Sequence, residues 1–344
     1  MRLHGPWRSL FNLVTRPLRS SGRSARETSL ALAGLRGRVE VLTDRWGVPH
    51  IYADSPHDLF FTQGYVTARD RLFQIDYNRH AVSGRLCELV GRRVLPWRDL
   101  TVHLKDRTTL DVDVMLRTFG IAEVARESLR LHAPETRDIL SAYAAGVNAF
   151  IAQNRPSWEH RLLRIELRPW EAVDSLLMVK GIGFELNYGW RAVLLGALLA
   201  DHDVPEDVAR VIWPHFPQDG APILKRGQWR TVAREMLATH KAAEQAGLGG
   251  ISGVGSNCFA VAGSRSKNGD ALLANDTHLA LTAPVPWHEV HLEGGGFSMH
   301  GFALAGVPGV AIGRTPHFAW GITAGLVQDC DLFLEQIHPE DPSR

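Results

Sequence analysis

One serine, Ser256, stands where the sequence changes from a glycine-rich run to an alternating apolar pattern. The run 247–255 reads G-L-G-G-I-S-G-V-G, and the segment S-N-C-F-A-V-A follows it directly. If the bond between Gly255 and Ser256 is cut, the serine becomes a chain terminus whose own α-amine can act as base for its hydroxyl. A free α-amine has a pKa of about 7.7–8.0, so much of it is unprotonated near neutral pH. This junction predicts acyl transfer, first within the chain and then on a substrate.

The alternative for G-S-N is an ordinary turn or cap, because such tripeptides are common there. A second candidate, His278, lies in the segment A-N-D-T-H-L. It could be a hydrogen-bonded core residue, or it could lie near Ser256 and position the hydroxyl. The intrinsic pKa of a histidine, about 6.5, also allows a role in proton transfer. From the residues alone, both interpretations stay open.

Metal sites are less favoured by the sequence. The segment H-E-V-H, with His288 and His291, lacks the four-residue spacing of the helical zinc motif, and on a strand these two side chains point to opposite faces. Asp329 and Asp331, in Q-D-C-D, could bind calcium through oxygen atoms or could be solvated or paired acids. The segment H-L-E-G-G-G-F matches no phosphate-binding loop.

Composition indicates a globular chain with no nucleic-acid partner. The chain has 344 residues, 45% hydrophobic and 22% charged, with a net charge of +1, and its three cysteines are too few for a disulfide framework. No apolar run approaches the ~18 residues that a transmembrane helix needs. Residues 1–37 hold seven arginines and one acid, which predicts a disordered basic tail; a surface-binding or weak export segment is the alternative. No clear signal peptide is visible, so the compartment stays open.

The first two-thirds of the chain is predicted to be mainly helical. Segments 38–43 and 50–53 favour strands, after which Ser55 and Pro56 form a helix start, a cap followed by proline. A long helix follows, Pro134 opens another that continues through residue 150, and residues 170–200 form a third helical region interrupted by glycines.

The last part of the chain changes period. Residues 229–245 are typical of a charged helix, and we interpret 229–255 as a linker or spacer outside the core. From Ser256 the period is two, and Asn268-Gly269 predicts a hairpin with 271–274 as the returning strand. Further alternating segments predict an antiparallel sheet that begins at Ser256. Helices before the serine and strands after it indicate a layered α+β fold.

Nine ordered blocks carry a resemblance that extends from about residue 38 to the end of the chain. They lie at 44–53 (D-R-W-G-V-P-H-I-Y-A), 63–76 (Q-G-Y-V-T-A-R-D-R-L-F-Q-I-D), 83–91 (S-G-R-L-C-E-L-V-G), 143–151 (Y-A-A-G-V-N-A-F-I), 167–171 (L-R-P-W-E), 255–257 (G-S-N), 272–279 (L-L-A-N-D-T-H-L), 305–313 (A-G-V-P-G-V-A-I-G) and 319–325 (A-W-G-I-T-A-G). In these blocks the chain resembles the penicillin acylase family of N-terminal-nucleophile hydrolases.

The resemblance implies a four-layer αββα fold and a precursor that cuts itself between Gly255 and Ser256. It implies a tail (1–37), an α-chain region (38–228), a spacer (229–255) and the start of a β chain (256–344), with α and β chains that stay associated. Ser256 would attack small N-acyl amides, such as β-lactam side chains or N-acyl homoserine lactones, and form an acyl-enzyme. In this reading the backbone N–H of Ala324 is an oxyanion donor, His278 positions the serine and Asn257 gives adjacent support.

The chain also departs from the family pattern. Only 89 residues run from Ser256 to the end, whereas family β chains are several times longer, so we expect a fragment whose fold is incomplete at the C-terminus. The resemblance implies no organic cofactor but a structural calcium ion: Asp331 matches one ligand, Gln328 stands where an acid is often found, and Glu185 is the nearest candidate for a helical glutamate. Family members are often exported.

Two alternatives to an acylase remain open. The first is a non-catalytic remnant of such an enzyme that at most binds acyl ligands. The second is a divalent-metal hydrolase that uses His288 and His291.

Overall fold

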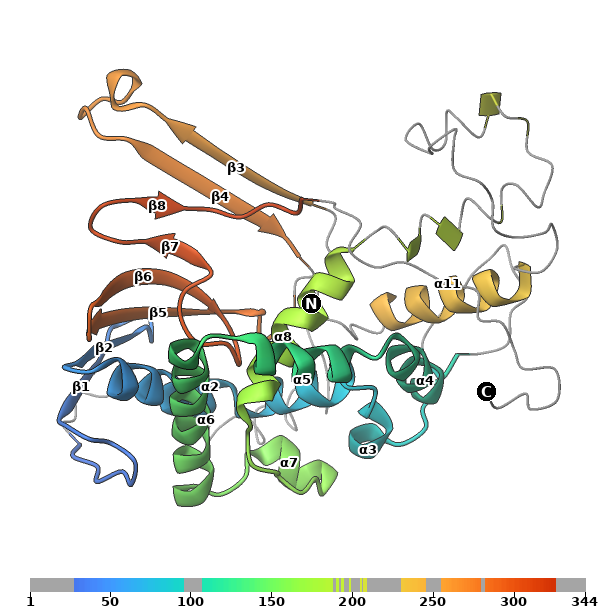
Figure 1. The fold of residues 1–344 in the computed structure, drawn as a ribbon, viewed down its shortest axis with the longest axis horizontal. Coiled ribbons are helices and arrows are strands. Elements are labelled where there is room, and N and C mark those ends of the chain that lie inside the picture. The colour runs from blue at the N-terminus through green and yellow to red at the C-terminus, as the bar shows by residue number, and fades with distance from the viewer. Residues whose placement is uncertain are drawn as a thin grey trace, which may run out of the picture. The chain divides into compact units, whose positions relative to one another are not determined.

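The computed structural model describes residues 28–95, 107–187, 230–245, 255–279 and 282–325, with positions 190, 191, 193, 194, 198, 205, 207 and 208. The chain divides into two compact units, Met1–Ala33 and Gly34–Arg344. The described residues of the first unit, 28–33, contain no helix or strand, and most of the predicted basic tail lies outside the described residues. All elements below belong to the second unit (Figure 1).

A six-stranded sheet forms the centre of this unit. Its strands, in spatial order, are β1 (Val39–Thr43), β2 (Pro49–Ala53), β5 (Trp287–Gly294), β6 (Phe297–Leu304), β7 (Ile312–Arg314) and β8 (Ala319–Trp320). Neighbouring strands are antiparallel except β2 and β5, which are parallel, with His50 opposite His291. The strands predicted at 38–43 and 50–53 are confirmed.

The predicted hairpin at Ser256 forms a sheet of its own. Strands β3 (Gly255–Val261) and β4 (Leu272–His278) pair antiparallel, with Ser256 opposite Thr277. The expectation of one antiparallel sheet beginning at Ser256 is therefore wrong. The main sheet instead contains β1 and β2 from the N-terminal part of the chain. Ile51 of β2 is fully buried and shares a hydrophobic core with Leu292 of β5, which stabilises this pairing.

Helices cover one face of the six-stranded sheet (Figure 1). The helices with described bounds are α2 (Pro56–Val82), α3 (Leu86–Val90), α4 (Thr109–Phe119), α5 (Ile121–Leu131), α6 (Pro134–Gln153), α7 (Trp158–Leu163), α8 (Ala172–Leu186) and α11 (Arg230–Gln245), and α2 and α6 are the two that pack on the core of the sheet. Apolar side chains of α2 and α6, such as Leu59, Phe60 and Ala142, pack against Val290 and Leu292 of the sheet. This arrangement confirms the α+β class. No helix among the described residues is apolar over a length that could span a bilayer.

Helix α2 begins as the sequence predicts. Ser55 is the N-cap, and its hydroxyl accepts a hydrogen bond from the backbone N–H of Asp58 at 3.1 Å, while Pro56 takes the first helical position. The Asp58 carboxylate in turn accepts the backbone N–H groups of Arg36 and Gly37, each at 2.9 Å. The start of the helix is thus attached to the segment that leads into β1.

Helices α2 and α6 touch backbone to backbone through two glycines. A Cβ atom placed on Gly64 of α2 would lie 2.1 Å from the carbonyl oxygen of Tyr143, and one placed on Gly146 of α6 would lie 1.8 Å from that of Phe61. Such distances are far below van der Waals contact. Only glycine at both positions allows this crossing.

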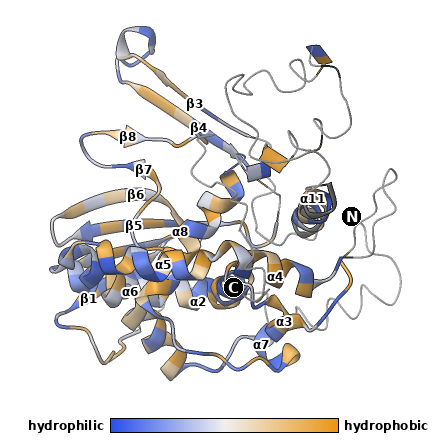
Figure 2. Cartoon of the chain, turned by 45° about the vertical axis from the view of Figure 1, so that its right-hand side comes forward, coloured by the Kyte–Doolittle hydropathy of each residue, from blue (hydrophilic) through white to orange (hydrophobic). Residues whose placement is uncertain are grey.

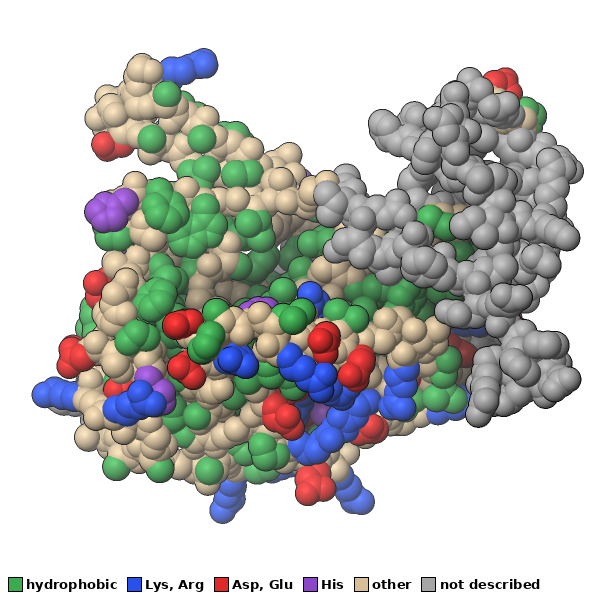
Figure 3. All heavy atoms as spheres, in the orientation of Figure 1, with side chains coloured by type: hydrophobic (Ala, Val, Ile, Leu, Met, Phe, Trp, Pro, Cys, Tyr) green, Lys and Arg blue, Asp and Glu red, His purple; other side chains and the backbone are tan. Residues whose placement is uncertain are grey.

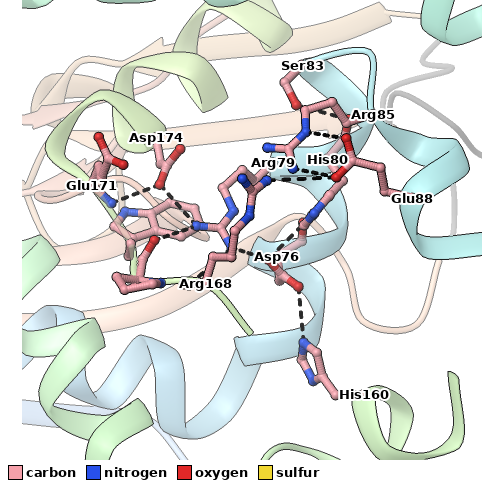
Figure 4. A network of polar contacts seen from close by, with 12 residues as sticks. Asp76, Arg79, His80, Ser83, Arg85, Glu88, His160, Arg168, Glu171 and Asp174 are labelled. Carbon is pink, nitrogen blue, oxygen red and sulfur yellow. Dashed lines mark hydrogen bonds and ion pairs between the residues drawn. The ribbon is translucent and has the colours of Figure 1, made fainter. Parts of the chain in front are cut away.

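A buried network of charged side chains joins α2 to α7 and α8 (Figure 4). Asp76 pairs with Arg79 and lies 3.2 Å from Nε2 of His160, while Arg79 also donates to Asp174 at 3.2 Å. Burial alone would raise the pKa of the Asp76 carboxyl, but hydrogen bonds from two histidines and the charge of Arg79 outweigh it and hold this pKa well below its usual range. Each buried charge has a partner, so the three helices hold one arrangement.

Helix α11 corrects the expectation that 229–255 lies outside the core. The predicted helix is present, but Ala233 and Ala242 are fully buried in two apolar clusters, and Ala238 is also buried. Small alanine side chains let a charged-looking helix pack closely, which the composition alone did not reveal. Residues 246–254 lie outside the described residues, and removal of a spacer stays a prediction.

Candidate active site

The structure brings Ser256 and Ala324 together. Ser256 is the second residue of β3 and is half-buried, and its Oγ accepts a hydrogen bond from the backbone N–H of Ala324 at 3.3 Å. Ala324 lies in the segment after β8, 68 positions further along the chain. A backbone N–H directed at a hydroxyl oxygen is the type of donor that can stabilise an oxyanion formed beside it. The hydrogen bond thus places Ala324 beside Ser256, while its role as an oxyanion donor stays a prediction.

The strand opposite Ser256 is bonded to β5, and the connection that leads from β4 to β5 is bonded to α2. Thr277, the cross-strand partner of Ser256, accepts a hydrogen bond at its Oγ1 from the indole Nε1 of Trp287 at 3.0 Å. Two residues before this tryptophan, the carbonyl oxygen of Val285 accepts one from Nε2 of Gln74 at 2.8 Å. The sequence reasoning missed these contacts, because strand register must be known before Thr277 can be placed opposite the serine.

His278 lies at the end of β4, opposite Gly255. Its Nε2 atom is 3.1 Å from the carboxylate of Asp276 and 3.4 Å from the side-chain amide of Asn257. One nitrogen cannot donate to the carboxylate and accept from the amide in the same tautomer, so the shorter contact favours a proton on Nε2 and an Asn257 oxygen turned toward it. The strand register places His278 beside the Gly255–Ser256 bond, while its positioning role stays a prediction.

Comparison with known proteins gives the geometry a context. The model of the family described as penicillin amidase matches residues 38–344. The chain belongs to the penicillin amidase family. The match includes Ser256, His278 and Ala324, the residues that meet around the start of β3.

Named relatives of this penicillin amidase family member are acylases. It is 30% identical over 314 residues to the acyl-homoserine lactone acylase QuiP of Pseudomonas aeruginosa, covering 89% of this chain and 35% of the relative. It is 31% identical over 322 residues to the penicillin acylase 2 proenzyme of Pseudomonas sp. (strain SE83), covering 90% and 39%. The chain thus spans little more than a third of the length of these relatives.

Among solved structures, a thermostable penicillin G acylase from Alcaligenes faecalis matches with 23% identity and a TM-score of 0.40. That match covers 55% of this chain and 95% of the other.

Asn275 is a further residue of the site that sequence reasoning missed. It precedes Thr277 by two positions on β4, and its side chain bonds to the backbone of both Asn257 and Ile322. The segment A-N-D-T-H-L contained the signal, since alternate residues of a strand share a face. The sequence analysis singled out His278 of this segment instead, because of the chemistry of its imidazole side chain.

The predicted calcium site and the alternative of a metal hydrolase have different outcomes. Glu185 is half-buried on α8, whereas Asp331 and Gln328 lie outside the described residues, so a calcium site stays a prediction. Within the described part of the chain, no three His, Cys, Asp or Glu side chains are placed to hold one metal ion. His288 is buried 3.4 Å from Asp70, whereas Nδ1 of His291 lies 3.2 Å from Nδ1 of His50. His288 and His291 have separate surroundings, which disfavours the metal-hydrolase alternative.

An apolar cavity of about 370 Å³ lies between α6 and β6. Its lining includes Phe60 and Met299 but not Ser256 or Ala324. This cavity is therefore not lined by the residues that meet around Ser256.

The ribbon β3–β4 that carries Ser256 exposes apolar side chains. Phe259 is 62% exposed and Leu272 is 52% exposed. In Figure 2 hydrophobic and hydrophilic residues follow one another along both strands, and Figure 3 shows hydrophobic side chains over the ribbon, with acidic and basic ones mixed over the helices. A two-stranded ribbon gains little stability by itself, so its contacts with neighbouring segments matter for the site.

Proposed function

We propose that this chain is part of an amidohydrolase of the penicillin acylase type, made as a precursor that cuts itself between Gly255 and Ser256. One observation carries the proposal: the hydroxyl of Ser256, at the start of a strand, receives the N–H of Ala324 at 3.3 Å. Nucleophile and oxyanion donor are thereby adjacent. The fold we propose for the whole protein is the four-layer αββα arrangement of the family.

The self-cleavage step begins at Gly255. Oγ of Ser256 attacks its carbonyl carbon, a C–O bond forms, the C–N bond breaks, and the serine nitrogen takes the proton. Water then hydrolyses the ester, which leaves a carboxyl group on Gly255 and a free α-amine on Ser256. Gly255 has no side chain to obstruct the attack, and a Cβ added there would lie 3.9 Å from Nδ1 of His278.

The processed serine would then act on substrate. Its free α-amine takes the hydroxyl proton while Oγ attacks an amide carbonyl. The C–N bond of the substrate then breaks, the leaving amine takes that proton, and water hydrolyses the acyl-enzyme to a carboxylic acid and free serine. We propose small N-acyl amides as substrates, because the relatives are named for acyl-homoserine lactones and penicillin. The two product chains would stay associated, since β2 and β5 pair across the cleavage point.

Intact mass and N-terminal sequencing of the purified chain test the proposal. We expect a fragment that begins Ser256-Asn257-Cys258 in the parent and in a Ser266→Ala control, but an uncut chain of 38.1 kDa in Ser256→Ala. Ser256→Cys should still cut while hydrolysing amides more slowly. Cleavage at this bond in Ser256→Ala, or an uncut parent chain, would contradict self-processing by this serine.

A further inference from the structure

We infer that Asn275 is a positioning residue that holds the N–H of Ala324 against the hydroxyl of Ser256. The inference rests on the proposed function, in which Ser256 is the nucleophile. It adds a residue whose side chain does not touch the reacting atoms, and which acts through the backbone segment after β8.

Both polar atoms of the Asn275 side chain are bonded. Oδ1 accepts the backbone N–H of Ile322 at 3.0 Å, and Nδ2 donates to the carbonyl oxygen of the same residue at 3.0 Å. Nδ2 also donates to the carbonyl oxygen of Asn257 at 2.8 Å. One amide group therefore pairs with residue 322 as a neighbouring strand would, and also binds the residue next to the nucleophile.

The segment that Asn275 holds approaches β3 closely. A Cβ atom on Gly321 would lie 2.6 Å from Sγ of Cys258 and 2.7 Å from Cβ of Asn275. Ala324 follows Ile322 by two residues, so the position of its N–H depends on where this short segment is fixed. The ribbon and the main sheet share no strand pairing, and this amide links the ribbon directly to the segment that follows β8 of the main sheet.

The size of the effect follows from the role of the donor. Loss of one oxyanion donor typically lowers a rate ~10²–10³-fold, and a misplacement of about 1 Å can cost ~10². We expect removal of the Asn275 bonds to slow cleavage at Gly255–Ser256 by roughly 10²-fold. In the processed protein kcat should fall similarly with little change in KM, because the donor acts mainly in the transition state.

Two substitutions separate bonding from packing. Asn275→Asp keeps the shape of the side chain but turns an oxygen, in place of the N–H donors, toward the carbonyl groups of Asn257 and Ile322. Asn275→Ala removes shape and bonds together. Asn268→Ala is the matched control, since that asparagine lies in the connection of the same ribbon and its side-chain amide donates to the carboxylate of Asp270 at 2.7 Å. If Asn275 only filled space, Asn275→Asp would behave like the parent.

The first readout is kinetic. Mass spectrometry follows the appearance of the fragment beginning at Ser256, and hydrolysis of octanoyl-4-nitroanilide gives kcat and KM. We expect both Asn275 variants to be slow and Asn268→Ala to match the parent, with melting temperatures that show each variant to be folded. Parent-like cleavage and kcat in Asn275→Asp would overturn the positioning role.

The second readout does not depend on cleavage. Hydrogen exchange of a peptide covering 319–325 is measured in a Ser256→Ala background, where the chain stays whole. Both Asn275 variants should speed exchange in this peptide, and Asn268→Ala should not. Unchanged exchange would overturn the inference even if the parent cuts normally. A parent chain that fails to cut would instead refute the proposed function, and the exchange result would still decide whether Asn275 holds the segment.

Discussion

Replacing Gly146 by alanine tests the helix crossing that supports the sheet. The added Cβ would lie 1.8 Å from the carbonyl oxygen of Phe61 and 3.0 Å from the backbone nitrogen of Tyr65. Reaching ordinary contact requires α2 and α6 to separate by more than about 1 Å. Because the obstacle is backbone, no rotamer change relieves it. Separation would also loosen the packing around Tyr143, which is fully buried.

The net change in the free energy of unfolding combines two effects. Alanine is favoured over glycine inside a helix by about 1 kcal/mol. Overpacking of a close contact typically costs ~1–3 kcal/mol and occasionally more. For so short a backbone contact we expect the upper end, about 3 kcal/mol, so Gly146→Ala should lower the free energy of unfolding by about 2 kcal/mol after the propensity gain.

Gly183 is the matched control for this prediction. It also lies inside a helix, α8, but it is exposed, and a Cβ there would meet nothing within 4 Å. Gly183→Ala should therefore raise stability by up to about 1 kcal/mol. Urea unfolding followed by circular dichroism at 222 nm compares both variants with the parent. Equal effects of the two substitutions, or a Gly146→Ala variant within about 0.5 kcal/mol of the parent, would refute the steric reasoning.

Two further predictions concern titration. Asp76→Asn should lower the free energy of unfolding by about 3–5 kcal/mol, because it leaves the buried Arg79 with one of its two acidic partners. The lowered pKa of Asp76 stabilises the fold above about pH 4, and this stabilisation is lost as pH falls further. Urea unfolding at pH 3–7 should therefore show a weaker dependence on acid in the variant than in the parent. Burial, with the charges of His50 and His300, lowers the pKa of His291, so stability should decline as pH falls below about 6.5. His291→Asn should reduce that decline in melting temperature between pH 8 and 5, and an unchanged slope would contradict the interpretation.

The helical part of the fold was predictable where local chemistry decides it. Ser55 with Pro56 marked the start of α2, and Pro134 marked the start of α6. The pairing of β2 with β5 was not predictable, because alternation shows that a strand has a buried face but not which strand lies beside it. The same limit affected α11, whose buried alanines also fit a solvated helix by composition.

The hairpin shows how a correct motif can still give a wrong register. A two-residue turn at Asn268-Gly269 would pair Ser256 with residue 281, whereas the structure pairs it with Thr277 through a connection that spans 262–271. The shift is an even number of residues, so the predicted face of each strand is preserved while every cross-strand partner changes. This is why Ser256 could be placed from the sequence and Thr277 could not.

The same distinction explains which candidate site residues the sequence predicted. Ser256 and His278 have side chains whose chemistry is recognisable alone, and the family resemblance supplied Ala324. The role of Asn275 cannot be recognised from its residue type, because an amide side chain is common. The role is seen only when the structure places two backbone segments within hydrogen-bond distance of the amide. A candidate nucleophile can be proposed from residue type and context, but a residue proposed to orient its oxyanion donor can be identified only when the tertiary register is known. If the Asn275 bonds carry the predicted hundredfold effect, the catalytic geometry is set as much by this amide as by the serine itself.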